Sequence, residues 1–199
     1  MKQRLVTALL VFLVPCISLA APPPDEIRYS YVDLGLTGGQ IDAGFTDFDF
    51  GTASVIGSWG VNTNIALFAG VAGGTVDVES QGFCCDIDTS EFTVGIIPHF
   101  ALAENVDIVF PLGALRAEVD DGFFSDDDTG YTIGVGIRAL VHPRWELSAG
   151  VSYVDIFDDD DQSFGGSVRW HIVSLFSLAL GVSFADDVES AALSARFTF

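Results

Sequence analysis

Three histidines, His99, His142 and His171, are the side chains of this sequence best suited to proton transfer near neutral pH. A catalytic histidine needs a nucleophile or substrate within hydrogen-bonding reach and a further group that orients its ring. No serine or carboxylate stands at a diagnostic spacing from any of the three. The sequence therefore predicts no catalytic residues, and we expect that the protein is not an enzyme.

Carboxylates are the second group that could do chemistry, because hard cations such as Ca²⁺ take six to eight oxygen ligands. Segments 47–51 (Asp-Phe-Asp-Phe-Gly) and 126–130 (Asp-Asp-Asp-Thr-Gly) contain parts of a calcium-loop motif, but neither has its full spacing. Acidic runs more often only keep a loop solvated. We therefore expect weakly bound divalent cations at most and no other cofactor, with these weak candidate ligands: Asp126, Asp127, Asp128, Asp158, Asp159, Asp160 and Asp161.

Cys84 and Cys85 are the only cysteines after residue 20. Neighbouring cysteines can close a strained ring in an oxidising compartment. Pairing with a partner chain and remaining free are the alternatives. A metal site is not expected here, because no histidine is near in sequence.

The charge balance is strongly acidic, with 28 Asp and Glu against 8 Lys and Arg. Two of these cations, Lys2 and Arg4, lie at the N-terminus, which leaves 6 arginines and a formal charge of −22 (6 − 28) after residue 20. Such a chain repels a polyanion, so a nucleic-acid partner is excluded.

The first 20 residues have the pattern of a secretory signal peptide. Lys2 and Arg4 precede an apolar run over 5–14, and the small residues of 18–20 (Ser-Leu-Ala) form a cleavage site. Lipidation at Cys16 is the alternative, but Pro15 is a poor residue before a lipidated cysteine. We predict a cleaved signal over 1–20 and a single domain over 21–199.

Hydrophobic residues make up 49% of the chain, yet after residue 20 no apolar stretch is long enough for a membrane-spanning helix, which needs about 20 residues. Apolar and polar residues instead alternate, most clearly over 176–184 and 193–199. A period of two is typical of β-strands. A hydrophobic chain built from such strands is typical of a transmembrane β-barrel.

The alternation predicts an all-β fold, an antiparallel up-and-down barrel of about ten strands. The expected strands are 27–36, 51–61, 65–77, 91–102, 106–119, 129–141, 145–157, 163–172, 176–185 and 189–199. Eight strands is the alternative count, because the alternation slips around Gly73, Gly74 and Pro111. A soluble β-sandwich is the alternative fold.

The connections are expected to alternate in length. Those over 62–64, 103–105, 142–144 and 173–175 are tight, whereas the other five are mostly longer and hold or adjoin 22 of the 28 acids. Short periplasmic turns and longer extracellular loops are typical of outer-membrane barrels. The tight turns are therefore predicted to be periplasmic and the acidic loops extracellular.

Aromatic residues form two bands in this arrangement, as expected where a barrel meets the two membrane interfaces. The band near the tight turns contains Trp59, Phe100, Trp145, Trp170, Phe176 and Phe199. The other band contains Phe92, Tyr131, Tyr153, Phe157, Phe164 and Phe184.

Seven charged residues are predicted to face the lumen: Asp33, Glu91, Asp107, Arg138, Glu146, Arg169 and Arg196. Charges in a narrow lumen are costly unless paired, so we expect a network of arginines and carboxylates that fills the barrel. The alternative is that these charges line a narrow water path.

The two ends of the domain resemble known sequences. The last eight residues, Ala-Leu-Ser-Ala-Arg-Phe-Thr-Phe, resemble the C-terminal strand of bacterial outer-membrane proteins, and 29–35 (Tyr-Ser-Tyr-Val-Asp-Leu-Gly) resembles the first strand of small OmpA-like, porin-family barrels. The resemblance implies a place in the outer membrane, next to its lipid and lipopolysaccharide. It also implies an assembly signal at Phe197 and Phe199, which the barrel-assembly machinery reads after periplasmic chaperones deliver the chain.

Fold does not determine function, so the role is inferred separately. We expect a structural or surface-interaction barrel with a lumen filled by side chains. A small passive pore is the first alternative. An outer-membrane lipid-modifying or proteolytic enzyme is a distant one, because all three histidines lie near the predicted periplasmic end.

Overall fold

The computed structural model describes residues 26–42, 47–80, 83–120, 122, 125–157 and 159–199, and their regular secondary structure is entirely β. The predicted signal peptide lies outside the described residues. The strands are β1 (Tyr31–Asp42), β2 (Asp47–Asn62), β3 (Ile65–Ser80), β4 (Phe83–Ala103), β5 (Val106–Val109), β6 (Leu112–Asp120), β7 (Ser125–His142), β8 (Trp145–Ile156), β9 (Asp159–Val173), β10 (Phe176–Ala185) and β11 (Val188–Thr198).

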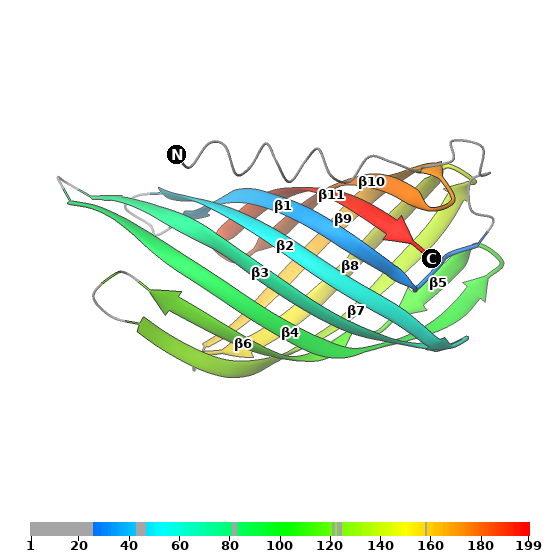
Figure 1. The fold of residues 1–199 in the computed structure, drawn as a ribbon, viewed down its shortest axis with the longest axis horizontal. Coiled ribbons are helices and arrows are strands. Elements are labelled where there is room, and N and C mark those ends of the chain that lie inside the picture. The colour runs from blue at the N-terminus through cyan, green and yellow to red at the C-terminus, as the bar shows by residue number, and fades with distance from the viewer. Residues whose placement is uncertain (1–25, 43–46, 81–82, 121, 123–124, 158) are drawn as a thin grey trace.

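These strands form one closed antiparallel barrel (Figure 1). Each of β1–β4 and β7–β11 pairs with its sequence neighbours in the wall, and β1 also pairs with β11 along the closing seam. Both β5 and β6 lie between β4 and β7, and β4 keeps the same register with both. The two segments are therefore one interrupted wall strand. The prediction of ten strands is confirmed, and the eight-stranded barrel and the β-sandwich are wrong.

Two prolines explain the interruption at residues 110 and 111. The Phe110 N–H donates to the carbonyl of Pro98, and the Gly134 N–H donates to the carbonyl of Pro111, each at 2.8 Å. Neither proline has an N–H to return the second hydrogen bond of its pair. One residue pair on the β4 side and one on the β7 side therefore keep only one of their two hydrogen bonds, and the strand assignment breaks there although the register does not.

The tight turns lie where the sequence places them, at residues 63–64, 104–105, 143–144 and 174–175. A register shift stands beside each of them. The start of β1 and the C-terminus lie at this end of the barrel (Figure 1). We call it the periplasmic end, as is usual for short turns and chain termini in these barrels.

The opposite end differs from the prediction. The expected long loops are mostly paired strand, so β3 and β4 continue to Ser80 and Phe83, and β8 and β9 are only two residues apart. Many acids expected in loops therefore lie on extended hairpins. The alternation pattern does not reveal these extensions, because Asp, Thr and Gly replace its apolar half there.

The outward face of the wall is apolar and exposed in the isolated chain. Leu180, Val151 and Leu193 are 67%, 54% and 50% exposed. Aromatic pairs border this belt, with Trp145 stacked on Trp170 towards the periplasmic end. Phe164 stacked on Phe184 borders its other side. An apolar band between two aromatic girdles matches the hydrocarbon layer of a membrane.

Among the described residues, no helix is long and apolar enough to cross a membrane.

Leu180→Arg is expected to destabilise the barrel by about 2–4 kcal/mol, because a charge then faces lipid in the middle of the belt. Thr129→Arg is the control, since Thr129 faces outward two residues beyond Tyr131 and should cost about 0–1 kcal/mol. Urea unfolding in lipid vesicles measures both. Equal costs would contradict a membrane belt at this position.

Candidate functional site: the barrel lumen

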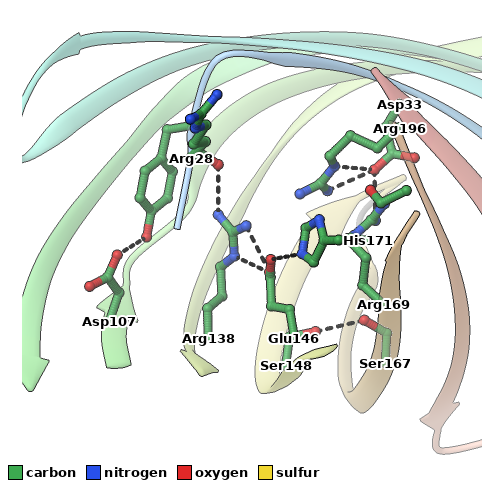
Figure 2. Close-up of polar contacts among 12 residues, drawn as sticks. Arg28, Asp33, Asp107, Arg138, Glu146, Ser148, Ser167, Arg169, His171 and Arg196 are labelled. Carbon is green, nitrogen blue, oxygen red and sulfur yellow. Dashed lines mark hydrogen bonds and ion pairs between the residues drawn. The ribbon is translucent and has the colours of Figure 1, made fainter. Parts of the chain in front are cut away.

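Inward-facing charged residues meet near the periplasmic end in two ion-pair groups (Figure 2). In the first, Arg169 Nη2 and Arg196 Nη2 lie 2.9 and 2.7 Å from the same oxygen, Oδ2 of Asp33. Arg169 also donates to the hydroxyls of Ser177 and Ser194. Asp33 is on β1 and Arg196 is its direct partner on β11, so this pair bridges the barrel seam.

The second group joins β7, β8 and β9. Arg138 Nη2 lies 2.8 Å from Oε1 of Glu146, and its Nε donates to the same oxygen at 2.8 Å. His171 Nε2 lies 3.3 Å from the other carboxylate oxygen of Glu146. Both Glu146 oxygens are therefore occupied, as a charge that is only 5% exposed requires.

The segment before β1 covers this network on its periplasmic side. The Tyr29 hydroxyl donates to Asp107 Oδ2 at 2.8 Å, across the lumen on β5. Its ring stacks on His99 of β4 with centroids 3.6 Å apart, and the Arg138 guanidinium lies 4.8 Å from the ring centroid. We call this segment, residues 26–30, the strap.

Five of the seven predicted lumenal charges therefore lie in these two groups, and a sixth, Asp107, holds the strap. Glu91 does not join them. It lies towards the other end of β4, is exposed, and accepts a hydrogen bond from Thr93. The alternation along β4 predicts that Glu91 faces the lumen, but it does not predict where along the barrel axis Glu91 lies.

Sequence reasoning missed Tyr29, His171, Ser177 and Ser194 as members of the network. His171 and Ser177 are cross-strand partners, and both occupy inward positions of the alternation. The alternation could therefore have indicated that both side chains face the lumen. Ser177 is fully buried and accepts a hydrogen bond from Arg169. Tyr29 precedes β1, so no strand pattern indicates where it packs.

The two ion-pair groups and the strap fill the lumen near the periplasmic end. We call this filled layer the floor. A cavity of only about 10 Å³ remains beside Arg138, Glu146, His171 and Arg196, about the space of one water molecule. On the periplasmic side a recess of about 640 Å³ opens beside the strap. On the outer side the lumen is hollow, which the prediction of a filled lumen did not foresee.

The hollow outer lumen, which we call the well, contains a cavity of about 380 Å³. This cavity reaches Arg138 at the floor. Its wall carries small residues on β8 and β9, where Ser148 pairs with Ser167 and Ser152 with Ser163. The lumen is therefore plugged at one end and open at the other.

The weak candidate metal ligands whose side chains the structure describes do not form an ion-binding group. Strand alternation turns Asp127 outward to Arg116, at 2.9 Å, whereas Asp128 accepts backbone hydrogen bonds from Thr129 and Phe157. Within the described ranges, no three His, Cys, Asp or Glu residues form a group that could hold an ion. Asp158 lies outside those ranges, and weak divalent-cation binding stays a prediction.

The backbone of Cys84 and Cys85 lies in β4 near the tip of its hairpin with β3, opposite Glu79 and Val78. The three alternatives for their redox state remain open.

Comparison with known proteins agrees with this architecture. A family model described as outer membrane protein beta-barrel domain matches residues 8–171, most of the chain. The chain belongs to this family. It is therefore an integral barrel of the bacterial outer membrane, as its exposed apolar belt requires. No sequence among curated proteins matches it.

Solved outer-membrane barrels share the fold. The translocator domain of the autotransporter NalP from Neisseria meningitidis is 9% identical, with a TM-score of 0.51 over 100% of this chain and 95% of that one. The beta domain of the Bordetella autotransporter BrkA is also 9% identical, with a TM-score of 0.54 over 86% of this chain and 100% of that one. At such identities the likeness shows the fold alone.

Asp33→Asn is expected to destabilise the barrel by about 3–5 kcal/mol, because it leaves the buried Arg169 and the partly buried Arg196 without a counter-charge. Asp127→Asn breaks the exposed pair with Arg116 and should cost about 0–1 kcal/mol. Urea unfolding of both variants in vesicles makes the comparison. A cost for Asp33→Asn as small as for Asp127→Asn would mean that the network does not hold the seam.

Proposed function

We propose that this outer-membrane barrel acts at the cell surface and does not serve as an open diffusion pore. The observation that carries the proposal is the floor, where only about 10 Å³ of free space lies beside Arg138 and Glu146. A hydrated ion needs a continuous water path to cross. The paired charges would have to separate to provide one, at a cost of several kcal/mol per buried ion.

The outer hairpins support a role at the surface. The ladder of β3 and β4 is paired out to Ser80 and Phe83, nine residues beyond Phe92 of the outer aromatic band (92 − 83). At 3.3 Å per residue this is about 30 Å of strand. The hairpins therefore offer surface well outside the lipid.

The hairpin register places like charges directly opposite one another. Asp49 pairs with Asp77, and Asp88 pairs with Asp120. Such pairs destabilise a sheet unless cations accompany them. These paired acids support the proposal that the hairpins bind cations. Divalent ions that bridge the acidic hairpins to lipopolysaccharide phosphates are the first candidates.

Conductance in planar bilayers tests the closed floor. The unmodified barrel should give no steady channels. A triple variant with Asp33, Arg169 and Arg196 changed to Ser should give discrete conductance steps, because it removes both signs of charge together and leaves none of the three charges without its counter-charge. Changing the exposed pair Arg116 and Asp127 to Ser is the control and should leave the barrel closed. Steady conductance of the unmodified barrel would favour the passive pore instead.

A second proposal concerns assembly through the C-terminal aromatic residue. Phe199 is 60% exposed and lies 6.0 Å from the ring of Trp59, whereas Phe197 packs on Phe176. An exposed terminal aromatic is available to a recognition partner before the seam closes.

Phe199→Asp should therefore lower the yield of heat-modifiable barrel in outer membranes far more than Phe197→Leu, which keeps an apolar side chain. Unboiled and boiled samples compared on denaturing gels measure the folded fraction. Refolding of each variant in detergent separates recognition from stability. Equal membrane yields of the two variants would contradict an assembly signal at Phe199.

A further inference from the structure

A groove of about 970 Å³ crosses the outer surface of the barrel wall, from β7 through β8, β9, β10 and β11 to β1. These strands are neighbours in the sheet (Figure 1). Two rows of outward side chains form the sides of the groove. Cross-strand pairing gives the members of the first row: Val135, Val151, Phe164, Phe184, Glu189 and Gln40. The second row begins with Ile133, Tyr153 and Gln162.

The base of the groove is backbone. Between the two rows lie four residues that are cross-strand partners of one another and that also line the groove: Gly134, Ser152, Ser163 and Ala185. Their positions in the alternation face the lumen, so they present main-chain atoms to the outside. The groove is therefore separated from the well by the thickness of the sheet.

The groove climbs the barrel because the strands are tilted. Cross-strand partners followed once around the wall, from Arg138 through β8, return to β7 at Asp126, 12 residues (138 − 126) nearer the outer end. The rows beside the groove climb in the same direction, from β7 to β1. Five steps between strands make about 24 Å, which is a rise of about 15 Å along the axis at a tilt near 40°.

The chemistry of the groove changes along this rise. At its deep end Ile133, Val135 and Val151 are 47%, 39% and 54% exposed, so apolar surface is open to the hydrocarbon layer. Phe164 and Phe184 of the outer aromatic band follow in the middle. Beyond this band the lining becomes polar. The groove therefore connects the lipid-facing belt to the space outside the membrane.

The upper end of the groove is acidic. Four carboxylates line it, Asp42, Asp186, Asp187 and Glu189, and among the described residues that line the groove there is no lysine or arginine. The Asp42 N–H donates to the Asp187 carbonyl at 2.8 Å, which joins β1 to the turn between β10 and β11. The acids are thus held together at one end. Their field attracts a cation and repels a phosphate group.

These properties decide between possible occupants. Ligand sites commonly measure 300–1,000 Å³, and the groove has this size. A water-soluble ligand gains nothing at an end that lies in hydrocarbon. A second copy of the chain would bring the same acids to the same level and be repelled. An amphiphile with an apolar chain and a cationic group matches both ends.

We propose that the groove binds one membrane lipid whose headgroup carries an ammonium group. An acyl chain lies between the side-chain rows at the deep end, and the ammonium lies among the carboxylates at the upper end. Gln162, two residues from Phe164 along β9, has amide N–H groups that can donate to the polar linkage between chain and headgroup. A lipid with a purely anionic headgroup meets repulsion at the upper end.

Native mass spectrometry of the full barrel released from detergent micelles tests the proposal. The probe is dioleoyl-phosphatidylethanolamine, and EDTA is present so that divalent ions cannot bridge acids and phosphate. One molecule should be retained. N-acetylation of the probe removes the ammonium charge and should weaken binding at least tenfold, as should replacement by dioleoyl-phosphatidylglycerol. Equal affinity for the free and N-acetylated lipids would overturn the proposal.

Acidic variants locate the headgroup. Asp187→Asn combined with Glu189→Gln should lower affinity for the ethanolamine lipid at least tenfold, to the level of the glycerol lipid. Asp88→Asn combined with Asp120→Asn is the matched control, because it removes the same charge from the hairpin of β4 and β6, away from the groove. Equal losses in the two double variants would mean that net charge, and not this site, sets the affinity.

A second pair of variants locates the acyl chain. Val151→Trp fills the deep end of the groove and should abolish retention of the lipid. Val55→Trp is the matched control, since Val55 on β2 is 44% exposed, faces the same hydrocarbon layer and does not line the groove. Heat-modifiability confirms that each variant is folded. Unchanged retention by folded Val151→Trp would overturn the assignment of the chain to this groove.

The lipid site and the proposed function are tested separately, because conductance reports on the floor inside the barrel and lipid retention reports on its outer surface. A barrel that does not conduct and does not distinguish the two lipids would keep the proposed function and remove only this site.

Discussion

The closed hydrogen-bond ladder is the constraint on which the rest of this structure depends. Within a bilayer no water is available to backbone N–H and C=O groups, so each must find its partner in the chain. Joining β1 to β11 meets this demand at the last open edge. Once the ladder is closed, every strand has one face to lipid and one to the lumen. The prolines at 98 and 111 are tolerated because the flanking rungs stay in register.

The same constraint explains what the sequence could predict. A period of two places Leu180 outward and Arg138 inward from the residue types alone, because a one-residue slip would reverse both faces. Strand positions, tight turns and the lumenal direction of the charged residues all follow from this period. The period gives no guidance in the hairpin extensions, where water lies on both sides and no apolar face marks the strand.

The candidate site was predictable only in part, because alternation gives direction and not height. Glu91 and Glu146 both face inward, yet only Glu146 lies at the level of the arginines. Tyr29 packs against residues 70 and 78 positions away, His99 and Asp107, and no local pattern encodes such contacts. The well escaped prediction for a related reason. Glycines and serines in a lumenal wall leave space, but their spacing shows this only after neighbouring strands are aligned.

The pair of Asp33 and Arg196 has a consequence for how the barrel is completed. The two residues are 163 positions apart and belong to the first and last strands, so their ion pair forms only when the seam is shut. Until that moment Asp33 and the two arginines of its group face the interior of an unfinished sheet without a counter-charge, at an unfavourable free energy. Closing the seam gives all three charges a counter-charge at once. Formation of the last hydrogen bonds between β1 and β11 is thereby coupled to charge neutralisation. This coupling adds to the free-energy difference between a nearly closed and a fully closed barrel.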